Sequence, residues 1–175
     1  MANSKTQTKP QVIDHPNESQ EAKLTPKDVD INQYITVKSG FQGKLVYKSP
    51  RTGEKFVWEN LGAEQELELK ELRSAKASSD GKKFFVNNWF MFDDEWVLDF
   101  LGVRQYYKNA IRLEDFDDFL LQPAATLKKS IQNLSAGQRK SIAYRAMQMI
   151  TDGEIDSRKT ISVLEEALGI ELVEK

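Results

Sequence analysis

Cysteine is absent from this chain of 175 residues, and histidine occurs once, as His15. The missing thiols exclude disulfides, thiolate nucleophiles, iron–sulfur clusters and cysteine-based zinc sites. A single histidine cannot build a multi-histidine metal site, and its place in a polar N-terminal stretch argues against a Ser-His-Asp triad. We therefore predict a protein that is not an enzyme and that holds no cofactor.

Long apolar runs and a dominant sign of charge are also missing. No apolar stretch approaches the roughly 18 residues of a membrane span, and the N-terminus lacks the apolar core of a signal peptide. Lys and Arg number 25 against 27 Asp and Glu, a formal net charge of −2, so no global basic field would steer nucleic acid to the protein. We expect a soluble protein of a reducing cell interior, with no membrane contact.

Residues 1–33 are predicted to form an extended arm with one short helical turn. The first 23 residues are rich in Asn, Ser, Gln, Thr and Lys, with Val12 and Ile13 as an adjacent apolar pair, which is too little apolar surface for independent folding. Thr25-Pro26-Lys27-Asp28 is typical of a helix start, with Thr as the cap and Pro at the first helical position. Such an arm suits contact with a neighbouring molecule, through Val12 and Ile13.

Residues 34–103 read as a β-rich domain because their apolar residues recur with a period of two. The alternating pairs are Ile35 and Val37, Leu45 and Tyr47, Phe56 and Trp58, and Leu67 and Leu69. Ser49-Pro50-Arg51-Thr52-Gly53 predicts a hairpin between the second and third strands. We expect a small antiparallel meander or an SH3-like sheet, then a helix over 70–77 and a break at Ser78-Ser79-Asp80-Gly81.

The segment from Phe84 to Phe100 carries seven of the chain's seventeen aromatic residues. Aromatic side chains bury large areas, so such a cluster is the centre of either a core or an interface. We expect most of these rings to cover the open face of the sheet, with one or two left for a partner. An exposed edge strand, expected at Ile35 or Leu67, is a further contact for a partner strand. The candidate partner-binding residues in this segment are Phe84, Phe85, Trp89, Phe90 and Trp96.

Residues 104–175 are predicted to form a helical module, after a helix that begins at Asp93 or Asp94 and ends at Gly102. Ser135-Ala136-Gly137-Gln138 fits a capping box, in which the Ser and Gln side chains each satisfy a backbone donor of the other. Asp156 or Ser157 should begin the last helix. The fold class is thus α+β: a small antiparallel sheet, then helices, with an N-terminal arm.

Acidic residues are plentiful but do not form a recognisable metal motif. Asp93-Asp94-Glu95 and Glu114-Asp115-Asp117-Asp118 are in principle able to bind Mg²⁺, yet acids at helix starts are favoured by the helix dipole alone. Asp152-Gly153-Glu154-Ile155-Asp156 imitates the middle of an EF-hand loop but lacks oxygen ligands at three required positions. We interpret it as a turn between helices, with no metal.

Nucleic-acid binding is the alternative function that the residues allow. Lys82 and Lys83 precede two phenylalanines, a pattern of charge beside stacking rings, and Arg139, Lys140 and Arg145 make one predicted helix locally basic. The acidic overall balance and the absence of a phosphate-binding glycine loop argue against it. A nucleic-acid or polymerase-associated accessory factor is therefore the second hypothesis.

The order of motifs resembles a family of small uncharacterised proteins of large tailed bacteriophages that infect Gram-positive hosts. The similarity runs from about Tyr34 to Glu174, through GKLVY, TGEKFVW, LGAEQELELKEL, FFVNNWFMFDDEWVLDFLGV, YY and DGEIDSRKTISVLEEALGIEL. It carries no catalytic motif. The resemblance implies a structural component of the head, neck, tail or baseplate, located in the host cytoplasm during assembly and then in the virion. Its partners would be other virion proteins and copies of itself, with no small-molecule substrate.

Overall fold

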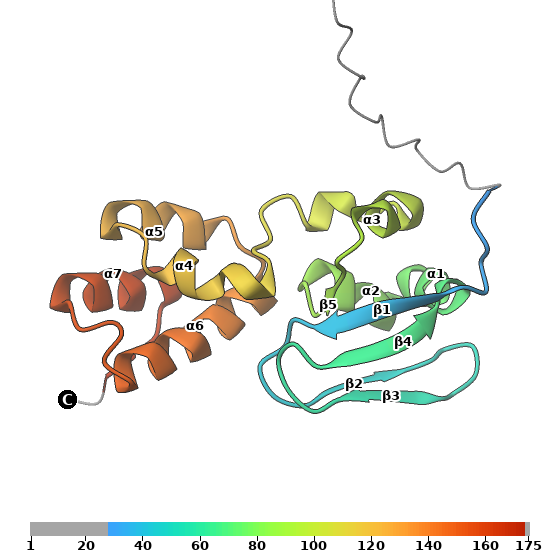
Figure 1. Cartoon of the computed structure of the whole chain (residues 1–175), viewed down its shortest axis with the longest axis horizontal. Coiled ribbons are helices and arrows are strands. Elements are labelled where there is room, and N and C mark those ends of the chain that lie inside the picture. Colours follow the sequence, from blue (N-terminus) through green and yellow to red (C-terminus); the bar gives the residue numbers. More distant parts are fainter. Residues whose placement is uncertain (1–27, 174–175) are drawn as a thin grey trace, which may run out of the picture.

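The structure, a computed structural model, describes residues 28–173. It is α+β, as predicted, with small antiparallel sheets followed by helices. Figure 1 shows a β-rich half that begins at the N-terminal end of the described chain and a helical half that contains its C-terminal end. Val12, Ile13 and His15 lie outside the described residues, as does most of the predicted helix start at Thr25. Within residues 28–33, a turn is closed by the Gln33 amide, which donates to the Asp30 carbonyl at 3.1 Å.

The β-rich half contains two separate antiparallel sheets. One has the strand order β4-β1-β5 and the other pairs β2 with β3. Their bounds are β1 (Tyr34–Ser39), β2 (Leu45–Lys48), β3 (Lys55–Trp58), β4 (Glu64–Glu68) and β5 (Phe90–Met91). The predicted strands and the hairpin after β2 are present, except that Leu69, expected in the fourth strand, begins α1. β1 pairs with β4, at Ile35 opposite Leu67, rather than with β2. Because β1 lies between β4 and β5, the strand edge expected at Ile35 is wrong, whereas Leu67 does lie on an edge strand. The strands therefore do not follow one another in a simple meander.

The period-two pattern explains how the hairpin packs on the larger sheet. Leu45, Tyr47 and Trp58 are buried while Val46 and Lys48 between them are exposed. The Trp58 indole Nε1 donates to the Val37 carbonyl of β1 at 2.8 Å, and the Gln65 amide Nε2 of β4 donates to the Val57 carbonyl of β3 at 2.7 Å. Side-chain hydrogen bonds thus join two sheets whose strands do not pair.

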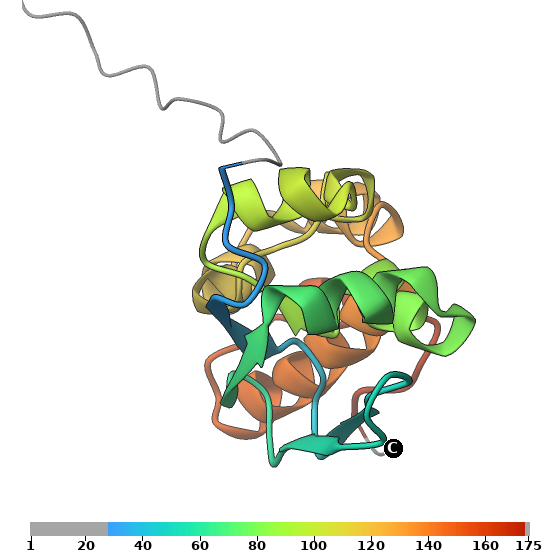
Figure 2. The ribbon, with the colours of Figure 1, turned by 90° about the vertical axis from the view of Figure 1, so that its right-hand side faces the viewer.

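Helices cover the sheets and build the second half of the molecule. In the first half they are α1 (Leu69–Ala77), α2 (Ser79–Val86) and α3 (Glu95–Leu101), followed by the 3-10 turns η1 (Arg104–Tyr106) and η2 (Leu113–Asp115). The second half contains α4 (Phe116–Leu120), α5 (Ala124–Gln132), α6 (Ala136–Thr151) and α7 (Arg158–Leu168). Figures 1 and 2 both show α1 and α2 between α3 and the β2–β3 hairpin.

Local capping signals account for several helix ends. Ser157 caps α7 through its side chain, and Gly102, at φ 64°, ends α3 in the left-handed conformation that glycine favours. The predicted break at Ser78 is only one residue long, because its Oγ accepts from the Gly81 amide at 2.9 Å and begins α2. The sequence analysis missed α2 and α5.

Each half has its own hydrophobic core. The first contains buried residues from Ile35 to Val103, and the second from Phe116 to Leu172. The largest fully buried side chains of the first half are aromatic, namely Trp58, Tyr47, Phe85 and Phe90, whereas those of the second are aliphatic, namely Leu120, Leu127, Ile131, Ile142 and Met149. Helix α6 carries residues of the second core and also contacts the first half, so it joins the two.

The contact between the halves depends on the first turns of α6. A Cβ at Gly137 would collide with the Asn87 carbonyl oxygen and lie 2.7 Å from the Trp89 Nε1, so only glycine permits this approach. One turn later, the buried Ser141 hydroxyl donates to the Gly40 carbonyl at 2.8 Å. The backbone of the β-rich half therefore lies directly against this helix.

Of the two hydrogen bonds predicted for the capping box at Ser135, one is present and the other is absent. The Ser135 Oγ accepts from the Gln138 amide at 3.1 Å, as expected. The Gln138 side chain does not return to the cap. It instead accepts from the Ile111 amide at 2.9 Å and donates to the Ile111 carbonyl at 2.6 Å, because burial beside the connecting segment offers it two backbone partners. Gln138 thus fixes the connection between the halves.

Candidate interaction surface

Most of the aromatic segment is core, and this corrects part of the predicted partner surface. Phe85 and Phe90 are 0% exposed, so neither is accessible to a partner in this structure. The Phe90 ring lies 5.5 Å from the Tyr47 and Phe85 rings and 4.8 Å from the Phe84 ring, measured between centroids. Three elements, β2, α2 and β5, meet at these rings, which explains why they are buried.

The other aromatic candidates are half-buried. Phe84, Trp89 and Trp96 pack against the first core and keep part of their surface accessible. Trp89 lies in edge contact with Phe41 and Phe84 and under Gly137 of α6. Its Nε1 is the one buried side-chain donor or acceptor of the described residues that lacks a partner. The close approach of α6 explains its burial, and Trp89 is therefore a residue of the junction rather than of an open surface.

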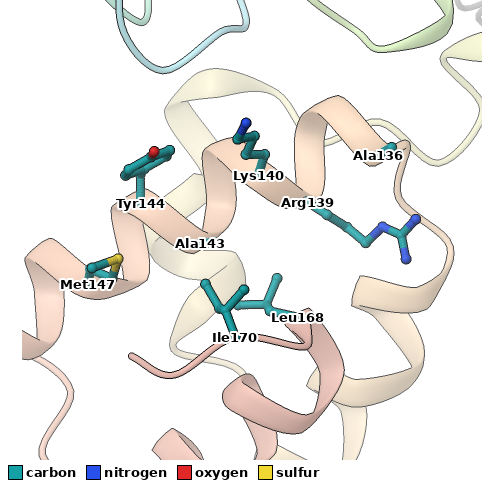
Figure 3. Close-up of a pocket in the computed structure, with 8 residues that line it drawn as sticks. All are labelled: Ala136, Arg139, Lys140, Ala143, Tyr144, Met147, Leu168 and Ile170. Carbon is teal, nitrogen blue, oxygen red and sulfur yellow. The ribbon is translucent and has the colours of Figure 1, made fainter. Parts of the chain in front are cut away.

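An accessible apolar surface is present on the helical half, where the sequence analysis predicted no apolar surface. A groove of about 470 Å³ runs along α6 and is lined by Ala136, Arg139, Lys140, Ala143, Tyr144, Met147, Leu168 and Ile170. Six of these eight residues are apolar or aromatic. Figure 3 shows Leu168 and Ile170 facing α6 across the groove, with Arg139 and Lys140 toward the start of the helix.

The helical repeat explains why α6 forms this groove. One stripe of α6, at Gly137 and Ser141, contacts the β-rich half, and a second, at Ile142 and Met149, enters the second core. The groove residues form a third stripe, spaced three or four positions apart, which is the spacing of one helix face. Its alanines are short, so the longer side chains around them enclose an open channel.

The opposite wall of the groove is held in place by the chain after α7. The backbone of Gly169, at φ 69°, ends the helix and turns the chain so that Ile170 lies beside α6. Two residues later, Leu172 is buried, and its amide donates to the Glu165 carboxylate at 2.9 Å. Since Ile170 lies between two anchored points, the wall exists before any partner binds, which lowers the ordering cost of binding.

Three side chains of the groove expose much apolar surface. Tyr144 is 45% exposed, Met147 40% and Ile170 41%. Arg139 and Lys140 supply two cations, and among the described residues no carboxylate lines the groove. An apolar floor beside positively charged side chains suits a segment that carries apolar side chains followed by acids.

The five residues predicted to contact nucleic acid differ in their positions and in their partners. Arg145 is committed to Asp117: its Nε and Nη2 donate to the two carboxylate oxygens at 2.6 and 2.7 Å. This pairing lowers the pKa of Asp117 and raises that of Arg145, in both cases chiefly through the hydrogen bonds. Lys83 pairs with Asp80 at 3.0 Å, and Lys82 is exposed on α2. Arg139 and Lys140 belong to the groove.

The acidic residues are distributed over separate ion pairs. Asp93 binds Lys38, with 2.7 Å between Oδ2 and Nζ, and this contact raises the Lys38 pKa. Glu114 pairs with Arg112. In residues 28–173, no three His, Asp or Glu side chains are grouped so that they could hold a metal ion. The turn at Gly153 connects α6 to α7, as interpreted from the sequence.

A buried acid lies in the β-rich half, between α1 and the β2–β3 hairpin. Glu71 of α1 is 2% exposed and accepts from the Tyr47 hydroxyl at 2.7 Å and from the Arg51 Nη2 at 3.2 Å. Burial, and then the hydrogen bond to Glu71, raises the Tyr47 pKa. Because Tyr47 and Arg51 both belong to the hairpin, we interpret these hydrogen bonds as contacts that hold the hairpin against α1.

A second hollow, of about 630 Å³, lies between the hairpin and the start of α2. It mixes the apolar Val46 and Phe84 with the polar Ser49, Ser79 and Asp80. This hollow lacks the continuous apolar floor of the groove. The groove on α6 is therefore the better candidate for an interaction surface.

No family model, curated protein or solved structure matches this chain. In the part of the chain that the structure describes, no helix is long and apolar enough to cross a bilayer.

The sequence analysis missed Tyr144, Met147 and Ile170 as surface residues. The stripe of α6 that contains Ile142, Ala146 and Met149 enters the second core. A second stripe of apolar residues on the same helix, at 136, 143, 144 and 147, was the signal available. Ile170 follows the last helix, and only the turn at Gly169 brings it to α6.

Proposed function

We propose that this protein is a non-enzymatic structural or assembly component of a tailed phage particle, which binds neighbouring subunits through the groove on α6. The observation that carries the proposal is the exposed apolar lining of that groove, at Tyr144, Met147 and Ile170. The N-terminal arm and the accessible parts of Trp96 and Phe84 are further contact candidates. The resemblance of the motifs to virion-associated phage proteins supports the particle as the setting.

The small size of the groove favours a single contact of low affinity, which becomes strong when many copies bind together. Complete burial of one large apolar side chain contributes about 1.5–3 kcal/mol. Three such side chains, already half covered, supply only part of that each, and association costs several kcal/mol. Many copies in one particle bind together with far higher avidity than a single pair. Assembly from weak, repeated contacts is the behaviour expected of such a component.

Purified particles test this proposal directly. Mass spectrometry should detect the wild-type chain in particles at a constant ratio to the other virion proteins. The double variant Tyr144→Glu/Met147→Glu introduces two charges into the groove and should be lost from particles. Its matched control is Leu121→Glu, since Leu121 is 57% exposed on a different surface.

Circular dichroism should show the same helix content in both variants, because all three substituted side chains are at the surface. Loss of the groove variant with retention of the control supports the groove as the docking surface. Absence of the wild-type chain from particles contradicts the assembly role. Equal incorporation of both variants contradicts the part given to the groove.

The second candidate, a nucleic-acid or polymerase-associated accessory factor, is favoured by one observation. Arg139 and Lys140 line the groove together with Tyr144, and cations beside an aromatic ring are able to hold a single strand. Binding through these residues and Lys82 would weaken steeply with rising salt. A gel shift with single-stranded DNA and RNA at low salt tests it: no retention of either strand excludes this candidate.

A further inference from the structure

The strongest inference concerns what fills the groove on α6, and it rests on the proposed assembly function. We propose that the groove binds the N-terminal segment of a second copy of this chain. Val12 and Ile13 occupy the apolar channel, and Asp14 lies toward Arg139 and Lys140. Each molecule then offers one segment and one groove to its neighbours.

The apolar pair of the segment matches the two walls of the groove. Successive side chains of an extended chain point in opposite directions. Two adjacent apolar residues therefore suit a channel that is apolar on both sides. The groove is lined by apolar side chains of both elements, with Tyr144 and Met147 from α6 and Leu168 and Ile170 from the end of α7 and the chain after it. The short side chains of Ala136 and Ala143 leave room for a backbone between these walls.

Charge complementarity selects this part of the N-terminal segment. Residues 10–22 contain Asp14, Glu18 and Glu21 and no Lys or Arg. The two charged residues of the groove lining are Arg139 and Lys140, both cations. Opposite charges at the edge of an apolar contact accelerate encounter and determine its direction. No other stretch of the first 27 residues combines a pair of β-branched apolar residues with a run of acids.

The position of residue 28 favours a neighbouring copy over the same molecule. Figure 1 places the start of β1 at the end of the molecule opposite α6 and α7. The 14 residues from Asp14 to Asp28 span at most about 50 Å when fully extended. To occupy its own groove, the segment would have to run back past the β-rich half to α6 (Figure 1). A neighbour needs no such path.

A contact between unlike surfaces of identical molecules is heterologous. It leaves one free segment at one end of the pair and one free groove at the other, so it repeats until a ring closes or a filament forms. Repetition of this kind is what an assembly component requires. The proposal therefore specifies how the copies are ordered, from segment to groove.

Two full-length variants with complementary defects test the proposal. Val12→Ser/Ile13→Ser removes the apolar pair and keeps the groove, whereas Tyr144→Glu/Met147→Glu removes the groove and keeps the segment. The controls are Thr6→Ala/Thr8→Ala in the segment and Leu121→Glu on the surface. Sedimentation velocity, over a wide concentration range, measures the association of each chain and of mixtures.

The expected result has three parts. The wild-type chain and both controls form oligomers whose mass rises with concentration. Each double variant alone associates more weakly by roughly tenfold or more, since it loses burial of two apolar side chains. An equal mixture of the two double variants forms a species of two chains and grows no further, because only one intact segment and one intact groove can meet.

Three results would each overturn the proposal. They are a wild-type chain that stays monomeric, a Val12→Ser/Ile13→Ser variant that associates as well as the wild type, and a mixture that forms no pair. The particle experiment is independent of all three. A monomeric chain that is still found in purified particles removes the segment-to-groove contact and leaves the assembly role intact, whereas an oligomeric chain absent from particles does the reverse.

Discussion

The two halves of this protein fill their cores in different ways. The β-rich half is filled by rings, with Tyr47, Trp58, Phe85 and Phe90 fully or almost fully buried, and the helical half mainly by aliphatic side chains. The sheets of the first half are two small pieces that do not pair with each other. Large rings are able to bridge them, because each ring reaches several segments at once. The helices of the second half lie close enough for Leu, Ile and Met.

This difference changes where a partner surface is expected. A dense run of aromatic residues is the natural candidate for an interface, yet here the rings are required to complete a small core. The helical half has apolar residues to spare on α6, which remain exposed at Tyr144 and Met147. The surplus of apolar side chains on α6, rather than their density elsewhere, is the reason that we propose the interaction surface there.

The largest expected effect tests the claim that the rings are core. Phe90→Ala should lower the free energy of unfolding by about 3–5 kcal/mol, because it leaves a cavity among the surrounding rings. Urea denaturation followed by circular dichroism measures it. The control Phe100→Ala, at a half-buried ring that contacts Trp96, should cost clearly less. Equal and small losses in both variants would show that Phe90 is not a core residue.

An intermediate effect tests whether the two halves are in contact at Gly137. Gly137→Ala should lower the free energy of unfolding by about 1–3 kcal/mol, because the added methyl group collides with the Asn87 carbonyl. In an unstrained helix the same change stabilises by about 1 kcal/mol, so the sign of the effect is diagnostic. The measurement is again urea denaturation, with Lys140→Ala on the same helix as the control. A stabilised Gly137→Ala protein would mean that the halves do not touch there.

The smallest expected effect concerns the helical half alone. Asp117→Asn breaks the ion pair that joins α4 to α6 and should cost about 0.5–1 kcal/mol at neutral pH. The pKa of Asp117 is lowered in the folded protein from its ordinary 3.8. Its contribution is therefore complete above that pH and is lost as the pH falls through the lowered pKa.

Thermal unfolding of the wild type and of Asp117→Asn, compared between pH 7 and pH 2, measures this dependence. The difference in stability between the two proteins should shrink toward the acid end. A difference that stays constant over this range would show that the ion pair contributes nothing. Asp118→Asn, at an exposed neighbour on the same helix, is the matched control and should change little at any pH.

Much of the fold could be predicted from short stretches of sequence. The alternation around Val37 and Tyr47 predicted β1 and β2, and Ser135, Ser157 and Gly102 marked helix ends. These signals depend on residues within one turn or one strand. The segment at Ser78 was misread as a break because a serine that caps a helix and a serine in a loop look alike in the sequence, and Gly81 follows closely.

The candidate site was much less predictable. Phe84, Phe85, Trp89, Phe90 and Trp96 were grouped because they are close in sequence, and the structure buries two of them completely. Tyr144 and Ile170 are 26 positions apart, and nothing local relates them. Gln138 was assigned to a cap and binds Ile111 instead. A side chain's partner depends on what the fold brings near it.

By itself the sequence determined that this chain is α+β, where its strands alternate, where several helices begin and end, and that its first residues carry an apolar pair within an acidic stretch. Those properties follow from hydrophobic period, capping and composition, which act over a few residues. The tertiary structure alone decided that β1 pairs with β4, that α6 meets the β-rich half at Gly137, and that an apolar groove stays open beside it. Each of these depends on contacts between residues far apart in the chain, and the energy of such contacts depends on the fit of surfaces that exist only after folding.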